Sequence, residues 1–300
     1  MRLFYKMCLL AFFAAPANAH AALSVFACVP EWAALAREIG GNRVNVFAAT
    51  NAMQDPHRIE ARPSLIARVR GSDLVVCTGA ELEVGWLPVL LQSAGNAKVQ
   101  PGTPGYFLAS EHARMIEVPT SVDRSLGDIH PGGNPHLHLD PRNVSRVGEA
   151  LAARFAQLDP AGAGAYQAQW KSFQERWLLA SRRWETQSAP LRGIKVIPRH
   201  KDLSYLWSWI GAQEIANVEP KPGISPSAAH LSELLTKVQA DPKTLLVRSA
   251  YQDAKATDWL SERGKVNVVV LPYTVGGSDR AKDLFGLFDD TVERLLKAVK

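Results

Sequence analysis

Aromatic residues in the middle of the chain recur at the spacing of one long α-helix. Between residues 161 and 188, Tyr166, Trp170, Phe173, Trp177 and Trp184 are separated by 4, 3, 4 and 7 residues. Residues at these spacings lie on one face of a helix, and so apolar a face is expected to be buried. The helix lies about halfway along the 300 residues, which favours a rigid strut between two lobes over an ordinary core helix.

On both sides of this helix, β-like runs alternate with helical patterns. The sequence predicts strands at 23–28, 44–48, 74–77, 194–197, 212–216, 245–248 and 266–271. It predicts helices at 31–40, 62–69, 84–93, 141–158, 203–210, 227–240, 255–263 and 282–299. Such alternation indicates parallel sheets covered by helices. We therefore predict an α/β fold of two Rossmann-like lobes, residues 20–160 and 191–300, joined by a single long linker helix at 161–190.

The first 19 residues are typical of a secretory signal peptide. Arg2 and Lys6 supply a basic start, residues 7–15 are apolar, and Ala17-Asn18-Ala19 is a small-x-small cleavage pattern. Cleavage is expected after Ala19, with Ala21 as a near alternative. Cys8 lacks the small residues that precede a lipid-modified cysteine, so we expect a soluble protein exported to the periplasm.

Charge and hydrophobicity exclude two classes of protein. The net charge is only +5, and no Lys/Arg-rich block occurs, so we expect no nucleic-acid partner. No apolar run approaches the length of a membrane-spanning helix, which argues against a polytopic membrane protein.

The exported chain would keep two cysteines, Cys28 and Cys77, at the ends of two predicted strands. Cysteines pair in oxidising compartments, and the carboxyl ends of neighbouring parallel strands come close together. Two buried thiols are an equally good interpretation. Two cysteines without CxxC spacing do not indicate a zinc ribbon or a redox motif.

Three of the eight histidines occupy comparable positions. His57 and His200 each follow a predicted strand, and His136 lies in a polar loop before a helix. In open α/β sheets, ligands bind at the carboxyl ends of the strands, so these imidazoles could converge from both lobes. Convergent neutral imidazoles suit Zn²⁺.

Carboxylates near these histidines could hold the ring nitrogens that do not bind the metal. Glu60 follows His57 and Asp140 follows His136, while Asp202 follows His200. Such partners fix the tautomer of a metal-binding imidazole. The three histidines are far apart in sequence, so their spacing alone indicates a metal site less strongly than a compact motif would.

Several short motifs together resemble a known family. They are Asp55-Pro56-His57 with Glu60, Ala80-Glu81-Leu82-Glu83 with Trp86-Leu87, Asn134-Pro135-His136 with Leu139-Asp140-Pro141, Arg199-His200 with Tyr205, and Pro226-Ser227 through Leu231. In this order and spacing, over residues 23–300, they resemble the solute-binding proteins of bacterial ABC transporters for zinc or manganese (cluster A-I). The resemblance implies two lobes bridged by a long helix, with one metal ion held between them.

The resemblance places His57, His136 and His200 on three metal-ligand positions. In the family, a carboxylate at the third position accompanies manganese and a histidine accompanies zinc. His200 therefore predicts Zn²⁺ as the cargo rather than Mn²⁺, in agreement with the preference of imidazole for zinc.

The chain departs from the family at the fourth ligand. The family has an Asp in the loop after the last strand, where this sequence places Tyr273 or Thr274. We predict Asp279, a few residues further on, as the fourth ligand, with a water molecule as the alternative.

Two further features leave alternatives open. His138 could replace His136 as a ligand if the segment is extended, because residues two apart then share a face. The stretch 119–133 corresponds to a metal-rich loop of zinc members but holds only Asp123, Asp128 and His130. It either passes metal inward or is a plain surface loop.

We therefore predict a non-enzymatic, monomeric, periplasmic zinc-binding protein that delivers Zn²⁺ to a membrane ABC permease. A periplasmic metallochaperone is a further candidate partner. The runner-up is an exported zinc-dependent hydrolase, in which three histidines and an open position would activate water. A third class, an adhesin or a binder of an organic ligand, would keep the fold and change the cleft.

Overall fold

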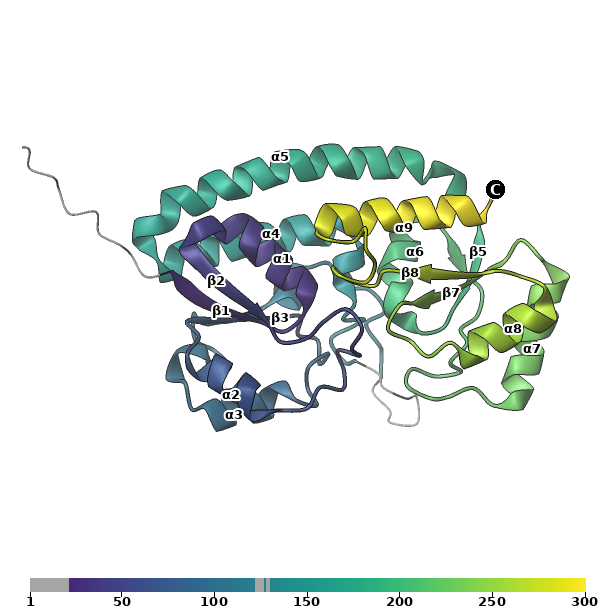
Figure 1. The fold of residues 1–300 in the computed structure, drawn as a ribbon, viewed down its shortest axis with the longest axis horizontal. Helices are drawn as coiled ribbons and strands as arrows, with labels where there is room; N and C mark the ends of the chain where they lie inside the picture. The colour runs from purple at the N-terminus through teal and green to yellow at the C-terminus, as the bar shows by residue number, and fades with distance from the viewer. Residues whose placement is uncertain (1–21, 122–126, 128–129) are drawn as a thin grey trace, which may run out of the picture.

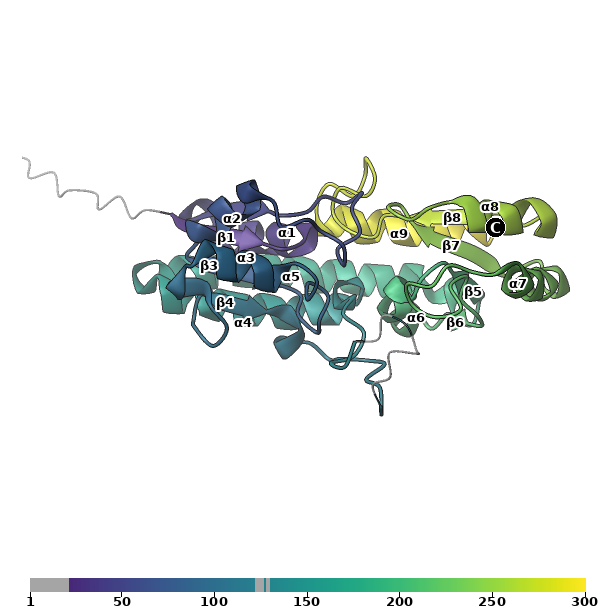
Figure 2. The same ribbon diagram turned by 90° about the horizontal axis from the view of Figure 1, so that it is seen from below.

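The computed structural model describes residues 22–121, 127 and 130–300. The predicted signal peptide at 1–19, and Asp123 and Asp128, lie outside the described residues. Two four-stranded sheets lie side by side along the longest axis of the molecule, one in each lobe (Figures 1 and 2). The fold is therefore the predicted α/β arrangement of two lobes.

The first lobe contains the elements that precede the long helix. They are β1 (Leu23–Ala27), α1 (Pro30–Gly40), β2 (Val44–Ala48), α2 (Pro63–Arg70), β3 (Leu74–Cys77), α3 (Leu87–Ala94), β4 (Tyr106–Leu108) and α4 (Pro141–Leu158). The long helix α5 (Ala163–Gln187) follows. The second lobe contains β5 (Lys195–Pro198), α6 (Ser204–Ile210), β6 (Gln213–Glu214), α7 (Ala228–Ala240), β7 (Leu245–Ser249), α8 (Lys255–Gly264), β8 (Val268–Leu271) and α9 (Leu284–Ala298).

Both sheets have the same topology. The strand orders are β2-β1-β3-β4 and β6-β5-β7-β8, and every neighbouring pair is parallel. In each sheet the chain goes first to one side of the starting strand and then to the other. Such a reversal opens a crevice at the carboxyl ends of the strands, and the loops that carry the histidines start there.

Local sequence signals set where several helices begin. Pro30, Pro63 and Pro141 occupy the first turns of α1, α2 and α4, where a missing N–H costs nothing. The side chain of Asp140 accepts a hydrogen bond from the backbone N–H of Arg142 and so caps α4.

The long helix joins the two lobes through one hydrophobic core. The five predicted aromatic residues of α5 are all buried. On α9, Phe285 packs edge-on against Trp177 with ring centroids 5.1 Å apart, and Phe288 stacks on Trp184 at 4.8 Å. Figure 1 shows α5 passing over both lobes, with α9 beneath it. A single cluster of buried residues reaches from β1 to β8. The exact division at 20–160, 161–190 and 191–300 remains a prediction.

Two strands differ most from the sequence prediction. β4 was not predicted, because its three residues follow a Gly/Pro-rich stretch and are too few to show alternation. β6 covers only Gln213–Glu214 of the predicted 212–216. Both lie at the outer edges of their sheets, where pairing on one side only demands less of the sequence. Within the described part of the chain, no helix combines the length and apolar character needed to cross a membrane.

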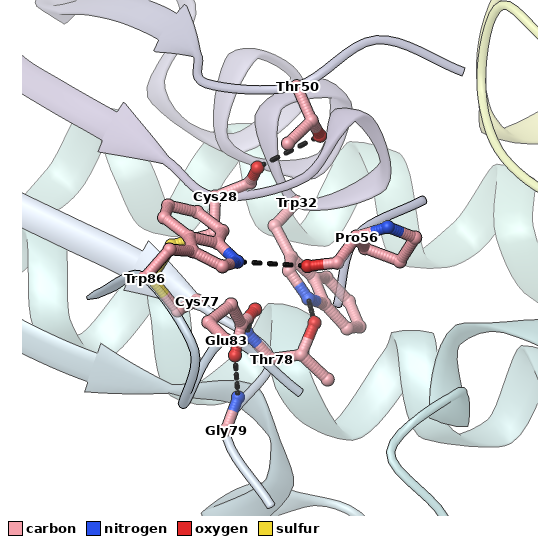
Figure 3. The surroundings of a disulfide bond; sticks show 9 residues. All are labelled: Cys28, Trp32, Thr50, Pro56, Cys77, Thr78, Gly79, Glu83 and Trp86. Carbon is pink, nitrogen blue, oxygen red and sulfur yellow. Dashed lines mark hydrogen bonds between the residues drawn. A yellow bond between two sulfur atoms is a disulfide. The ribbon is translucent and has the colours of Figure 1, made fainter. Parts of the chain in front are cut away.

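A disulfide joins Cys28 and Cys77, which decides between the two interpretations of these cysteines. Cys28 directly follows β1 and Cys77 ends the neighbouring strand β3, with Cα atoms 4.8 Å apart (Figure 3). Both side chains are fully buried. The bond therefore links β1 and β3 at the carboxyl ends of the strands, where the crevice of the first sheet opens.

Loss of this disulfide should lower the free energy of unfolding by about 3–4 kcal/mol, because it closes a loop of 49 residues in the unfolded chain. Urea unfolding of the residue 20–300 protein, with and without reductant, measures the difference. A Cys28→Ser/Cys77→Ser variant is the control and should not respond to reductant. Equal stability of the oxidised and reduced forms would contradict the prediction.

Candidate metal centre

The structure brings His57, His136 and His200 together between the lobes. One ring nitrogen of each lies within 4.8 Å of those of the other two. The ring centroids are 5.2, 5.8 and 5.6 Å apart for the pairs 57/136, 57/200 and 136/200. The predicted convergence is thus confirmed: His57 comes from the loop after β2, His136 from the loop before α4, and His200 from the end of β5.

The loop that carries His57 is held by the region around the disulfide. The indole N–H of Trp86 donates to the carbonyl of Pro56 at 2.9 Å (Figure 3). The side chain of Asp55 accepts from the backbone N–H of His57 at 3.0 Å. Buried Trp86 thus fixes the backbone directly before His57.

The loop that carries His136 is held by both lobes. The amide oxygen of Asn134 accepts from the backbone N–H of His136 at 3.0 Å, and its amide nitrogen donates to the carbonyl of Lys201 at 2.8 Å. The hydroxyl of Tyr205, on α6, donates to the carbonyl of Asn134 at 2.8 Å. His136 therefore lies in a turn of the first lobe that is hydrogen-bonded to the second lobe.

Each of the three imidazoles has a partner at Nδ1. Asp55 Oδ1 lies 2.8 Å from Nδ1 of His57, and Glu219 Oε2 lies 2.7 Å from Nδ1 of His200. The hydroxyl of Tyr273 lies 2.7 Å from Nδ1 of His136. If Nδ1 carries the proton in each ring, Nε2 keeps its lone pair. In that tautomer, Nε2 is the nitrogen that each ring offers to a metal ion.

The carboxylates expected beside the histidines have other roles, which corrects the sequence prediction. Glu60 is exposed, and Asp55 takes the expected role from the other side of His57. Asp140 caps α4 and pairs with Arg142 at 2.8 Å. Asp202 accepts from the hydroxyl of Ser249 at 2.6 Å.

The true partners were missed for identifiable reasons. Asp55 stands two residues before His57, where an Asp commonly accepts from the backbone, so a local signal existed. Glu219 and Tyr273 lie 19 and 137 residues from the histidines they contact. No local sequence pattern relates residues so far apart.

His138 is directed away from the three-histidine group. Its Nε2 lies 2.9 Å from the backbone oxygen of Tyr273, and its Nδ1 lies 3.2 Å from Oε1 of Glu31. Both ring nitrogens therefore face other groups, and His138 does not take the place of His136. Asp279 is exposed and also lies outside the group.

Tyr273 is one of the two residues, with Thr274, at which the family resemblance implies an acid. Its ring is buried, and burial raises the pKa of its hydroxyl well above the ordinary value. The phenol therefore stays protonated, so its contact with Nδ1 of His136 adds no charge.

His130, the described histidine of the 119–133 stretch, lies beside the group. Its ring centroid is 5.4 Å from that of His57. It lines a cavity of about 410 Å³, together with Glu117, His136, His200 and Lys201. The histidine group is thus reached from a cavity that the stretch borders.

The surroundings of the group shift the pKa values of His136 and His200 in opposite directions. Burial, followed by the neighbouring imidazoles of His57 and His200, lowers the pKa of His136 well below its ordinary value. Burial alone would lower the pKa of His200 too, but the hydrogen bond to Glu219 and nearby carboxylates outweigh it and raise that pKa. The pKa of Glu219 is lowered, because His200 outweighs the opposing effect of burial.

In the metal-free protein, His200 should therefore titrate at higher pH than His136. A raised pKa means that the folded protein favours the imidazolium of His200, whereas a lowered pKa keeps His136 neutral. NMR of the imidazole protons across pH 4–9 measures both. Glu219→Gln should lower the pKa of His200, because the negative partner is lost. An unchanged pKa of His200 in that variant, or a pKa of His200 below that of His136, would contradict the assignment.

A second group of potential ligands does not form a comparable site. Cys28, Cys77 and Glu83 lie together in the first lobe. Both sulfurs are bonded to each other, so no thiolate is present. The Glu83 carboxylate accepts from the backbone N–H groups of Thr78 and Gly79 at 2.8 and 3.0 Å.

Comparison with known proteins identifies the family. The profile described as "Zinc-uptake complex component A periplasmic" matches residues 25–298. The high-affinity zinc uptake system protein ZnuA of Yersinia pestis is 24% identical over 195 residues, which are 61% of each chain. The zinc-binding lipoprotein AdcA of Streptococcus pneumoniae is 20% identical over 88% of this chain and 52% of its own. A manganese ABC transporter substrate-binding lipoprotein, scaA of Streptococcus gordonii, is 24% identical over 47% of this chain and 44% of its own. The chain thus spans about half of the length of the curated relatives it matches.

Solved structures show the same fold. A crystal structure of ZnuA superposes with a TM-score of 0.76 at 21% identity, covering 93% of this chain and 100% of that one. A laminin-binding adhesin from Streptococcus agalactiae gives 0.72 at 19% identity, covering 91% and 99%. The match to the family profile extends over almost the whole described chain, and both lobes and the long helix have counterparts. This chain therefore belongs to the ZnuA family of periplasmic metal-binding proteins, the solute-binding components of ABC transporters.

Proposed function

We propose that this protein binds one Zn²⁺ ion between its lobes, in preference to Mn²⁺, and delivers it to a membrane ABC permease. The observation that carries the proposal is the group of three histidines, each held at Nδ1 by a partner. Zinc is cargo here and takes part in no reaction.

The chemistry of the group supports zinc. Three imidazole nitrogens are a common zinc donor set, whereas manganese favours oxygen ligands. Asp55 and Glu219 place two negative charges directly behind the rings of His57 and His200. Carboxylates in this position raise the basicity of the bound imidazole and fix its orientation. Together they offset the charge of a divalent ion.

We propose that water completes the coordination. Within the described residues, no carboxylate belongs to the group of ligand atoms that the three histidines form, in which all atoms lie within 4.8 Å of one another. Asp279, the fourth ligand predicted from sequence, is exposed on the loop after β8, so it would have to move to reach the ion. An Asp279→Asn variant distinguishes the two.

The family decides between transport and catalysis. Its members are transport components, which argues against the exported zinc hydrolase. This membership supports the proposed delivery to a permease and the proposed periplasmic location. A monomeric state and a metallochaperone as donor remain proposals.

Purified residue 20–300 protein should bind about one zinc per chain. Mass spectrometry of the metal content after zinc loading and gel filtration measures this ratio. Removing one imidazole by His57→Ala, His136→Ala or His200→Ala should abolish retention or weaken it at least about 100-fold, because each leaves only two protein ligands. His112→Ala removes a histidine outside the group and should retain zinc. Asp279→Asn should also retain it if water is the fourth ligand. Wild-type protein that takes up no metal would contradict the proposed function.

The protein should also bind zinc in preference to manganese when both metals are present. With equal zinc and a 100-fold excess of manganese, the protein should carry zinc, because nitrogen donors and the order of stability of divalent ions both favour it. Metal content after equilibrium dialysis provides the measurement. Predominant manganese would overturn the assignment of cargo while leaving the site in place.

A further inference from the structure

Next to the histidine group lies a buried polar cluster, for which the metal site itself gives no reason. Glu31 and His138 are each 1% exposed, and Thr274 is 2% exposed. Burying a carboxylate is costly unless other groups compensate its charge. The buried carboxylate of Glu31 therefore calls for an explanation.

The hydrogen bonds of this cluster have a definite direction. A backbone carbonyl only accepts, so His138 Nε2 donates to the oxygen of Tyr273 at 2.9 Å. The hydroxyl of Thr274 donates to Glu31 Oε2 at 2.5 Å. Nδ1 of His138 lies 3.2 Å from Glu31 Oε1, at ion-pair distance but without hydrogen-bond geometry. Glu31 thus contacts both His138 and Thr274.

The cluster connects the two lobes. Glu31 lies in the first turn of α1, where the helix N-terminus stabilises a negative charge. His138 lies in the 3₁₀ turn Leu137–Leu139 before α4. Tyr273 and Thr274 belong to the loop after β8, in the second lobe. Two residues of the first lobe therefore hold a loop of the second: His138 contacts its backbone, and Glu31 contacts the side chain of Thr274.

The same loop reaches the metal centre through one side chain. The hydroxyl of Tyr273 lies 2.7 Å from Nδ1 of His136. His138, two residues along the chain, holds the backbone oxygen of the same tyrosine. The rings of His138 and Tyr273 also pack edge-to-face, with centroids 4.9 Å apart. Any displacement of the loop would move the phenol relative to His136.

We propose that Glu31, His138 and Thr274 are positioning residues for metal binding. They hold Tyr273 so that its phenol meets Nδ1 of His136, which keeps Nε2 of His136 directed at the ion. The inference rests on the proposed function, since it assigns these residues a part in retaining the metal. None of the three is itself a ligand.

A double-mutant cycle tests whether His138 acts through Tyr273. The variants are His138→Phe, which keeps a ring and removes both nitrogens, Tyr273→Phe, which removes only the hydroxyl, and the combination. Zinc release from each loaded protein is followed with an excess of a chromophoric chelator. The absorption spectrum of the Co²⁺-loaded proteins reports the geometry of the bound ion, which a change in general stability would not alter. His112→Phe is the matched control, because His112 lies outside the group.

His138→Phe and Tyr273→Phe should each speed zinc release about 10-fold, within the range found for partners of metal-bound histidines. The combination should release zinc no faster than Tyr273→Phe alone, because both changes remove one interaction. The Co²⁺ spectrum should shift in both single variants and stay unchanged in the control. Additive effects on release, or a wild-type rate and spectrum in His138→Phe, would overturn the inference.

Thr274→Val tests the same proposal if His138→Phe fails to fold. Valine has nearly the shape of threonine and removes only the hydroxyl that Glu31 accepts. It should also speed zinc release, and a wild-type rate would count against the proposal. Failure of the inference is distinguishable from failure of the proposed function. In the first case the wild-type protein binds zinc, and the variants release it at the wild-type rate or with additive effects. In the second case the wild-type protein binds no zinc.

Discussion

The packing of α5 against α9 and both lobes is the contact on which the metal site depends. Aromatic rings on α5 and α9 interlock, and the buried cluster that contains them continues from β1 to β8. A close-packed core of this kind resists deformation. Because both sheets contribute to it, the carboxyl ends of their strands keep a fixed relation, and histidines from both lobes can meet.

Electrostatics explains how three imidazoles can stay close together without an ion. Burial lowers the pKa of His136, so this ring stays neutral, while the carboxylates of Asp55 and Glu219 lie at Nδ1 of the other two rings. The metal-free site therefore avoids the repulsion of three buried cations. The same carboxylates then face the rings from behind when a divalent ion arrives, so one arrangement serves both states.

Tyr273 connects this site to the rest of the interface between the lobes. Its phenol lies at Nδ1 of His136, one of the proposed ligands. The coordination then depends on how the loop after β8 is held. That role falls to groups from the first lobe, namely His138 at the backbone of Tyr273 and Glu31 at the side chain of Thr274.

Apart from β4, the sequence by itself determined the order of the elements, the long aromatic helix and the three histidines, because periodicity and loop position are local properties. It could not settle the cysteines, since two buried thiols and a disulfide look alike in sequence. The Nδ1 partners were beyond it as well: Glu219 and Tyr273 come near the histidines only when two sheets are packed against one helix. Contacts between residues so far apart are set by the tertiary fold, and they decide which ring nitrogens are free to bind a metal.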